Sequence, residues 1–326
     1  MNKNAVRTGE ILFVKCVKDG IPNRDPLRES DARRIFGEDD SRISLSDVSI
    51  KRDVRDYVLA KYADGGTAKD MFVFVRKEFT EGNKLMGRDS LAKTLIERAG
   101  KNPKTAGEVE LLAAAFDARV FGVVFSVGGR AFNQCGPVQF GWAHSLHPVE
   151  TKYVQGTVVM PSKDVEIKAD TGEETGATQG TIWTTYMLPF AVFAMPGVIN
   201  ASIAKDTQMG ANDVEVLLEG LWKGTLSRQA RGRGIQQPLL LLHVEYKDPF
   251  FRIGYLEEGL RLEPGRETWL GSCPPASLGE ISLDVTALQA LLNENLDRIH
   301  RVRRWVDPKL KLSGTLPGEE GQWPNA

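Results

Sequence analysis

The segment from Ser46 to Tyr57 constrains the fold most, because it combines a helix start signal with one apolar and one basic face. Ser46 is a favoured N-cap residue, and Asp47 follows in the first turn, where the helix dipole favours an anion. Apolar side chains recur at helical spacing, at Ile50, Val54, Tyr57 and Val58. The pattern predicts an amphipathic helix with one side packed in a core.

Three basic side chains fall together on the opposite side of this predicted helix, at Lys51, Arg52 and Arg55. Residues three and four apart are neighbours on a helix surface, so these cations would form a strip suited to a phosphate chain. The same segment also fits a solvated helix laced by Asp47–Lys51 and Arg52–Asp56 ion pairs. For the helix alone, the sequence leaves both interpretations open.

The chain is long enough for a substantial core but is not basic overall. Its 326 residues fit two domains or one elaborated domain. Hydrophobic residues make up 41% and charged residues 26%, as in ordinary soluble globular proteins. The net charge is -1, so any binding of nucleic acid must use local basic patches.

Cysteine use and hydropathy favour a reducing, cytoplasmic setting. Cys16, Cys135 and Cys273 are widely separated and show no CxxC spacing, which predicts neither a disulfide framework nor a cysteine zinc site. The N-terminus lacks the apolar core of a signal peptide. No run approaches the roughly 20 apolar residues that span a bilayer, so we expect no membrane partner.

Apolar segments rich in β-forming residues predict the strands of a sheet. The first, Glu10–Lys18, is followed by Asp19 and Gly20 and predicts a buried strand that ends in a turn. The other predicted strands span residues 71–79, 123–127, 138–146, 184–199 and 239–246. We expect the last of these to be the final central strand.

Helical patterns lie between and after these strands. Residues 84–116 predict a helical block, split by Gly100 and Pro103, that could be an insertion. Residues 212–222 predict an amphipathic helix, and residues 281–305 contain a predicted helix that ends in Arg298, Arg301, Arg303 and Arg304. The tail after Pro308 is expected to fray. This order is compatible with an α+β, ferredoxin-like β-α-β-β-α-β core carrying large insertions.

Residues 153–183 predict a long hairpin with a polar tip. Valine, threonine and charged residues alternate around the turn-forming segment Asp170–Gly176. The two arms carry little apolar surface, so we expect an arm that protrudes from the molecule.

Further basic residues lie outside the predicted helix. Residues 227–234 form a glycine-rich loop that could meet nucleic acid or a neighbouring subunit, and its arginines are Arg228, Arg231 and Arg233. Arg33 and Arg34 belong to a charged segment that could reach a ligand or simply be solvated. Arg119 lies beside an apolar strand, where an ion pair with Asp117 is the alternative to a ligand contact.

Catalytic patterns are weak in this sequence. His144 and His147 are three apart, so on a strand they would point to opposite faces, which argues against a shared zinc ion. The chain contains no GxSxG, HExxH, GxGxxG or Walker lysine pattern. Asp25, Asp31 and Asp39 show no metal-ligand spacing. We therefore expect no catalytic residues, no metal and no cofactor.

Four segments in order resemble a known family: residues 46–57, 116–122, 136–142 and 242–248. Together they resemble the backbone subunit of type I CRISPR-Cas surveillance complexes (Cascade), Cas protein family seven, most closely the subtype I-B group. The resemblance covers about residues 8–262. It departs at Ile21–Pro26, where relatives usually read Asn-Pro-Asn-Gly-Asp-Pro and this chain has Arg24 in place of glycine.

The resemblance implies an RRM-like palm with a helical fingers insertion and a thumb β-hairpin. It divides the chain into a first palm part (1–63), fingers (64–115), a second palm part (116–152), the thumb (153–183), the remaining palm with a C-terminal helix (184–306) and a flexible tail (307–326).

The resemblance also implies partners and contact residues. Copies of the protein would stack along a CRISPR RNA, present it to a target DNA strand, and join Cascade subunits of families five, six and eight. The implied RNA-binding residues are Lys51, Arg52, Arg55, Arg119, Gln139, Asn23, Arg33, Arg34, Arg228, Arg231 and Arg233.

The sequence leaves three functions to compare. The first is a non-catalytic RNA-binding filament subunit. The second is a metal-dependent ribonuclease of the same superfamily, in which Asp25 or Asp31 would cut target RNA. The third is a metabolic enzyme on a ferredoxin-like scaffold, which the missing active-site pattern disfavours.

Overall fold

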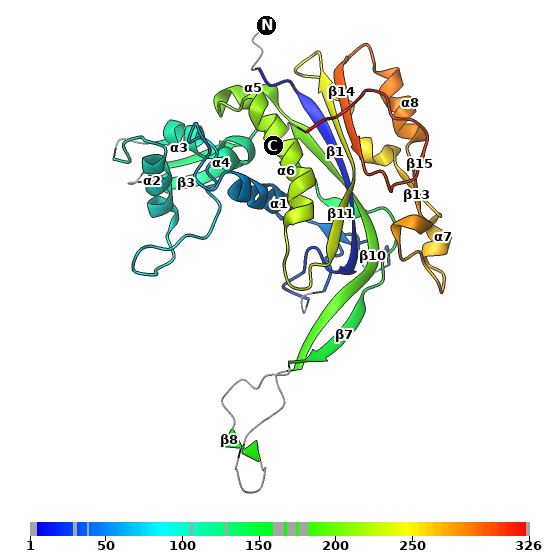
Figure 1. Ribbon diagram of the computed structural model, residues 1–326. Coiled ribbons are helices and arrows are strands. Elements are labelled where there is room, and N and C mark those ends of the chain that lie inside the picture. Colours follow the sequence, from blue (N-terminus) through cyan, green and yellow to red (C-terminus); the bar gives the residue numbers. More distant parts are fainter. Residues whose placement is uncertain are drawn as a thin grey trace.

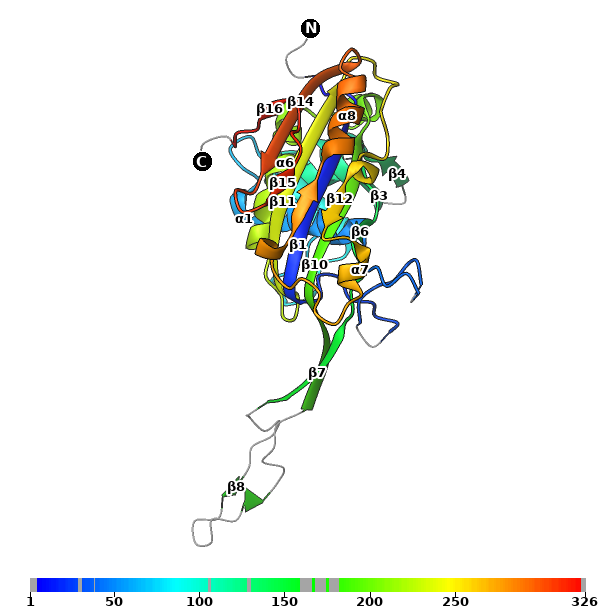
Figure 2. The ribbon, with the colours of Figure 1, turned by 90° about the vertical axis from the view of Figure 1, so that its right-hand side faces the viewer.

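The computed structural model describes residues 5–28, 31–37, 39–104, 107–127, 130–158, 166–167, 174–175 and 182–323. A nine-stranded sheet forms the centre of a mixed α/β fold. Helices cover one face of this sheet, and a smaller layer of strands and helices covers the other (Figure 1, Figure 2).

The centre of the sheet is strand β1 (Gly9–Gly20). It lies antiparallel between β10 (Ile182–Ile199) and β11 (Ile235–Tyr246). The strand order is β16-β14-β11-β1-β10-β6-β2, and β5 and β7 also pair with β10. The outer strands are β2 (Ser44–Leu45), β5 (Val138–Phe140), β6 (Ala143–Ser145), β7 (Lys152–Thr157), β14 (Ile299–Val306) and β16 (Glu319–Glu320).

Alternation along β1 divides the core into two parts. Ile11, Phe13 and Val17 pack with the helices on one face, whereas Leu12 and Val14 pack with the smaller layer on the other. Both faces are buried, which explains why this strand is an apolar run. The predicted first strand is confirmed, as are the predicted strands at 184–199 and 239–246.

Two helices of the first face cross at very short range. The predicted helix after Ser46 is confirmed as α1 (Asp47–Lys61), and the predicted helix at 212–222 as α6 (Ala211–Ser227). A Cβ atom built on Gly224 would lie 2.3 Å from the backbone oxygen of Asp53. The small residue therefore lets α6 approach α1 closely. The short helix α5 (Ala201–Asp206) precedes α6.

Gly224→Ala is expected to destabilise the protein, because the added methyl group must push the two helices apart. Overpacking of this kind costs about 1–3 kcal/mol, which exceeds the gain of up to about 1 kcal/mol that alanine brings to a helix. Urea unfolding would measure the change. Gly265→Ala is the control, since a Cβ there meets nothing within 4 Å. Equal stability of the two variants would contradict this account of the crossing.

A helical insertion forms a separate cluster at one side of the molecule (Figure 1). It contains α2 (Arg88–Arg98) and α3 (Glu108–Ala114), as predicted, followed by α4 (Phe116–Phe121) and the hairpin β3 (Gly122–Val127) and β4 (Arg130–Cys135). The predicted strand at 71–79 is wrong. The backbone N–H groups of Phe74 and Val75 donate to the carboxylate of Asp117 instead of joining a ladder.

The predicted hairpin arm is confirmed at its base. Strand β7 pairs with the first part of β10, from Lys152 opposite Met187 to Thr157 opposite Ile182. This pair extends away from the sheet (Figure 1, Figure 2). Beyond it, β8 (Glu166–Ile167) pairs with β9 (Glu174–Thr175). Most of the predicted tip, including Asp170, lies outside the described residues.

The C-terminal part corrects two predictions. The four arginines predicted to end a helix follow α8 (Thr286–Glu294) instead, and three of them lie on β14, which extends the sheet beyond β11. The segment expected to fray contributes β16 beside β14, and Trp323 stacks on Trp305 with ring centroids 4.7 Å apart. The smaller layer consists of β12 (Arg261–Glu263), α7 (Arg266–Trp269), β13 (Ser282–Asp284), α8 and β15 (Leu312–Ser313).

Candidate nucleic-acid interface

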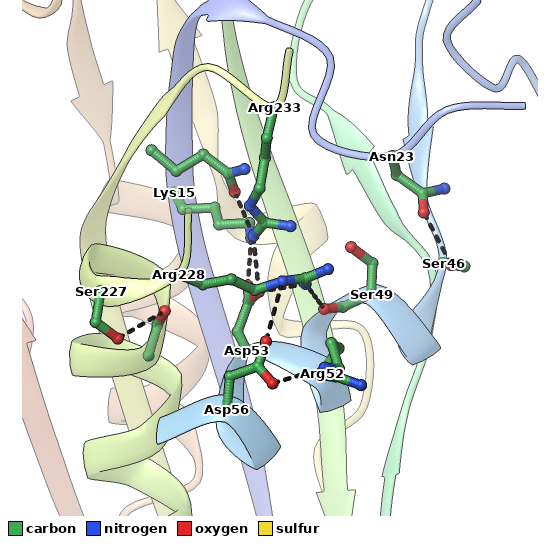
Figure 3. Close-up of polar contacts among 12 residues, drawn as sticks. Lys15, Asn23, Ser46, Ser49, Arg52, Asp53, Asp56, Ser227, Arg228 and Arg233 are labelled. Atoms are coloured by element: carbon green, nitrogen blue, oxygen red, sulfur yellow. Dashed lines mark hydrogen bonds and ion pairs between the residues drawn. The ribbon is translucent and has the colours of Figure 1, made fainter. Parts of the chain in front are cut away.

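A buried carboxylate on α1 gathers three basic side chains, one from the central strand β1 and two from the loop after α6 (Figure 3). Asp53 is completely buried. Its Oδ2 atom accepts a hydrogen bond from Lys15 Nζ at 3.0 Å, and its Oδ1 atom accepts from Arg228 Nη1 and Arg233 Nη2, each at 2.7 Å. The cluster ties α1 to the central strand and to the loop after α6.

Local sequence explains how each cation arrives there. Lys15 is on β1 and its side chain is buried against Asp53. Arg228 is the C-cap residue of α6, and its guanidinium group also donates to the backbone oxygen of Ser49 at 3.0 Å. The loop that carries Arg233 then turns through Gly234, which has a φ of 75°. That left-handed conformation favours glycine.

The charges of the cluster are unbalanced. Burial lowers the pKa of Lys15 to about 8, although the neighbouring Asp53 favours its charged form. Burial alone would raise the pKa of Asp53, but Lys15, Arg233 and Arg228 outweigh it and lower that pKa. Asp56 adds one more carboxylate, 3.4 Å from Arg228 Nε. Arg52 pairs with Asp56 as well, at 2.7 Å, so four cations share two carboxylates.

A groove of about 400 Å³ opens beside this cluster. The basic residues that line it are Arg24, Arg52, Arg228, Arg231 and Arg233. Asn23 also lines it and has a buried side-chain nitrogen without a hydrogen-bond partner among the described residues. A second cavity shares Arg228 and Arg231 with the groove and continues to Lys18. We call the two together the basic groove.

An aromatic side chain stands beside the basic groove. Trp183, at the start of β10, lies with its ring centroid 5.4 Å from the guanidinium carbon of Arg231. Its cross-strand partner on β7 is Gly156, and a Cβ there would lie only 2.4 Å from the Trp183 ring. The glycine therefore leaves the space that the indole occupies. Cations beside a partly exposed aromatic ring are the chemistry that binds single-stranded nucleic acid.

The basic face predicted on α1 is divided into two sides in the structure. Arg52 lines the basic groove and pairs with Asp56 at 2.7 Å. Lys51 and Arg55 are largely buried on the other side, with Lys51 2.9 Å from Asp47 and Arg55 2.8 Å from Asp117. The two predicted i,i+4 ion pairs are confirmed, whereas a single exposed strip of three cations is wrong.

Both the sequence and the fold have counterparts among known proteins. The profile of the family described as CRISPR-associated protein Cas7 matches residues 7–286. The chain belongs to the Cas7 family.

Two solved structures are similar to this Cas7 chain. A chain of a "CRISPR RNA-guided surveillance complex, pre-nicking" aligns with a TM-score of 0.54 and 15% identity, over 94% of this chain and 96% of that chain. A chain of a "CRISPR RNA-guided surveillance complex" aligns with a TM-score of 0.46 and 15% identity, over 94% and 95%. The first likeness shows a shared fold. The comparison with curated proteins found no match.

Two further predicted contacts of the Cas7 chain lie near Lys51 and in the interior. Gln139 accepts from Lys51 Nζ at 3.4 Å, and the ammonium group is 5.8 Å from the centroid of Phe121. Arg119 is only 4% exposed and is held by Asp213, at 2.8 and 3.0 Å, instead of the suggested Asp117. Arg119 positions α4 against α6 here, and its role as an RNA contact stays a prediction.

Arg33 and Arg34 have contacts within their own loop and with the segment at residues 142–149. Arg33 lies 5.9 Å from the Trp142 ring and donates to the backbone oxygen of Arg24 at 3.3 Å. Arg34 donates to the backbone oxygens of Ser41 and Val149 at 3.0 and 3.1 Å. These bonds orient the loop that carries Arg24 into the groove.

Sequence reasoning did not assign four residues to this site. Lys15 could have been noticed as a charged residue inside an apolar run, whereas Arg24 was noticed as the residue that replaces a glycine but was not counted among the contacts. Asp53 could have been noticed as an acidic residue on the apolar side of the predicted helix. Trp183 gave no signal, because only the pairing with Gly156 places it beside Arg231.

The residues considered for catalysis have structural contacts. The Asp25 carboxylate accepts from the N–H of Leu27, and Asp31 accepts from the N–H of Ala32 and, at 3.4 Å, from the hydroxyl of Thr151. His144 Nδ1 is 2.9 Å from the Ser44 hydroxyl. Within the described ranges, no three His, Cys, Asp or Glu side chains gather as metal ligands, and no helix has the length and apolar character to cross a membrane.

Proposed function

We propose that this Cas7 chain is a non-catalytic RNA-binding backbone subunit of a type I CRISPR interference complex, most similar to the subtype I-B group. The observation that carries the proposal is the basic groove with Trp183 beside it, in a chain of this family. The fold is shared with a chain from a structure named as a CRISPR RNA-guided surveillance complex, which supports the same assignment.

The architecture supports a palm, fingers and thumb. The order β11-β1-β10 around β1, followed by β5 and β6, with α1 and α6 on one face, supports a ferredoxin-like or RRM-like palm with a β-α-β-β-α-β pattern. In the proposal, residues 64–115 with their own apolar cluster are the fingers, and the arm at 153–183 is the thumb. Both flank the groove, since Arg52 is near the insertion and Trp183 is on the arm.

The proposed mechanism is binding without base reading. Arginine contacts to phosphate would supply an affinity that falls as salt rises, and a stacking indole accepts any base. Pairing between the guide and a target DNA strand would carry the specificity. Copies of the protein along one CRISPR RNA would bind strongly together through effective concentration. Cascade subunits of families five, six and eight are the further partners we propose.

The predicted contact set is kept in this proposal with the groove at its centre. Asn23, Arg52, Arg228, Arg231 and Arg233 line the groove. The remaining members do not line it, and they are Lys51, Arg55, Arg119, Gln139, Arg33 and Arg34. Of the cations in the groove, Arg228 and Arg233 also hold Asp53, so substitutions that test RNA binding should spare them.

The triple variant Arg24→Gln/Arg52→Gln/Arg231→Gln is expected to weaken binding of single-stranded RNA and to reduce its salt dependence. Each lost phosphate contact removes about 0.7 from the slope of log K against log salt, so three contacts remove about 2. Fluorescence anisotropy with two unrelated RNA sequences at several salt concentrations measures the slope. Both sequences should lose affinity equally, because phosphates carry no base information.

Arg252→Gln/Arg261→Gln/Arg266→Gln is the matched control, with the same charge change at exposed positions on or near the smaller layer. It should bind RNA like the unmodified protein. Size-exclusion chromatography after co-expression with CRISPR RNA gives a second readout, since the groove variant should lose the large RNA-containing species while keeping its melting temperature. Identical slopes for the two triple variants would refute the groove as the RNA site.

A further inference from the structure

Another basic cavity, separate from the two that form the basic groove, is also lined by Arg52. It has a volume of about 580 Å³ and lies between α1 and the helical insertion. Its lining is Arg52, Leu59, Arg76, Lys77, Glu78 and Arg98. Four of these six side chains are cations and one is a carboxylate. We call this cavity the side groove. Of its residues, only Arg52 was among the predicted contacts.

The cations of the side groove are incompletely paired. Glu78 forms ion pairs with both Arg76 and Arg98, so one carboxylate serves two guanidinium groups. The Arg76 side chain is only 10% exposed, yet its Nε has no hydrogen-bond partner among the described residues. Lys77 is exposed and forms no ion pair within the described part of the chain. A buried donor without a partner and a free ammonium group would both be satisfied by an anion.

The side groove is continuous with the basic groove through one residue. Arg52 lines both, and its Nε is held by Asp56 at 2.7 Å. A guanidinium group has five N–H donors in a fixed fork, so the remaining donors of Arg52 can face either cavity. A chain of phosphates that leaves the basic groove at Arg52 would therefore meet Arg76, Lys77 and Arg98 next.

We propose that the side groove binds the phosphodiester backbone of the same single-stranded nucleic acid where it leaves the basic groove. The inference rests on the proposed RNA-binding function and extends it to the insertion. Each protein copy then covers more of the strand than the basic groove alone. The insertion acts as a second wall for the strand, with Arg52 as the shared contact.

The test compares oligonucleotides of two lengths, of about 6 and about 24 nucleotides, which lie near the lower end and above the upper end of the roughly 4–16 nucleotide site sizes of single-stranded binders. The variant is Lys77→Gln/Arg98→Gln, which leaves Arg76 paired with Glu78. The long RNA should bind with a slope of log K against log salt reduced by about 1.4, for two contacts at about 0.7 each. The short RNA, which the basic groove can hold, should bind as it does to the unmodified protein.

Lys93→Gln/Lys101→Gln is the matched control, because it removes two exposed cations from the same insertion but outside the side groove. The proposal is overturned if the groove variant and this control bind the long RNA equally. It is also overturned if Lys77→Gln/Arg98→Gln abolishes binding of an acidic peptide while leaving the long RNA unchanged, which would assign the cavity to a protein partner.

The experiment distinguishes an error in the proposed RNA-binding function from an error in the side-groove inference alone. If the unmodified protein binds neither oligonucleotide at low salt, the proposed function fails and the inference fails with it. If both lengths bind and only the side-groove variant is without effect, the inference alone is overturned. Single-stranded DNA of the longer length forms a further arm. An equal reduction for DNA and RNA supports phosphate as the group that is bound.

Discussion

Asp53→Ala is expected to lower the free energy of unfolding by about 3–5 kcal/mol, the usual cost of breaking a buried ion pair on one side. Lys15 and Arg233 would remain in the interior without their carboxylate. Burial already lowers the pKa of Lys15 to about 8, so this lysine would have to stay charged at a cost or release its proton. Urea unfolding monitored by tryptophan fluorescence measures the loss.

Asp56→Ala is the control for this prediction, because it removes a partly exposed partner of Arg52 from the same helix. Exposed pairs contribute about 0–1 kcal/mol, so its effect should be small. Adding Lys15→Met to Asp53→Ala should recover part of the stability, since it removes the unpaired ammonium group. Similar losses for the two single variants would show that Asp53 is not the centre of the cluster.

Acid is expected to destabilise the protein through two buried histidines, as the pH falls from about 6.5 toward 4. Burial lowers the pKa of His147 to about 4, where its Nε2 accepts from the N–H of Val192 and its Nδ1 is 2.8 Å from the Pro148 oxygen. Burial and the nearby Arg303 lower the pKa of His243 to about 3. Between 6.5 and 4 the unfolded chain binds protons at these residues and the folded protein does not, so stability falls as the pH falls.

The loss should reach about 3 kcal/mol for each histidine by pH 4, since one pKa unit corresponds to about 1.4 kcal/mol. Urea unfolding at a series of pH values from 7 to 4 gives the free energy of unfolding as a function of pH. The prediction concerns the slope of this curve and not the absolute stability. His147→Gln and His243→Gln should each flatten the dependence. His300→Gln, at an exposed position, should leave it unchanged. Parallel curves for all four proteins would refute this assignment.

The spacing of apolar residues predicted correctly those helices and strands that pack against one continuous surface along their whole length. The apolar run at β1 and the spacing in α1 and α6 each reflect burial against one continuous surface. Residues 71–79 look like a strand because they are apolar, but Asp117 takes two of their N–H groups, and that contact is distant in sequence. Arg301 and Arg303 lie on β14, although the sequence predicted a helix there. In so short a segment, the spacing of charged residues does not distinguish the period of a helix from that of a strand.

The site was predicted only in part, because some of its residues are close in sequence and others are brought together by contacts between distant segments. Residues on one predicted helix or loop could be grouped, and Arg52, Arg228, Arg231 and Arg233 do line one groove. The exposure of Lys51 and Arg55 could not be predicted, because Asp117 and the ring of Phe121 come from another part of the chain. The sequence also could not place Arg76 and Arg98 of the side groove beside Arg52, because their position depends on how the insertion packs against α1.

The short β-strand β16 matters for a protein whose copies are proposed to pack closely along one RNA. It lies parallel to β14 at the end of the sheet order, with Glu319 and Glu320 opposite Arg303 and Arg304. An open sheet edge is a template on which a second sheet can grow. The edge strand of this sheet is therefore a two-residue acidic segment, and very short, charged edge strands offer little backbone for pairing with another sheet.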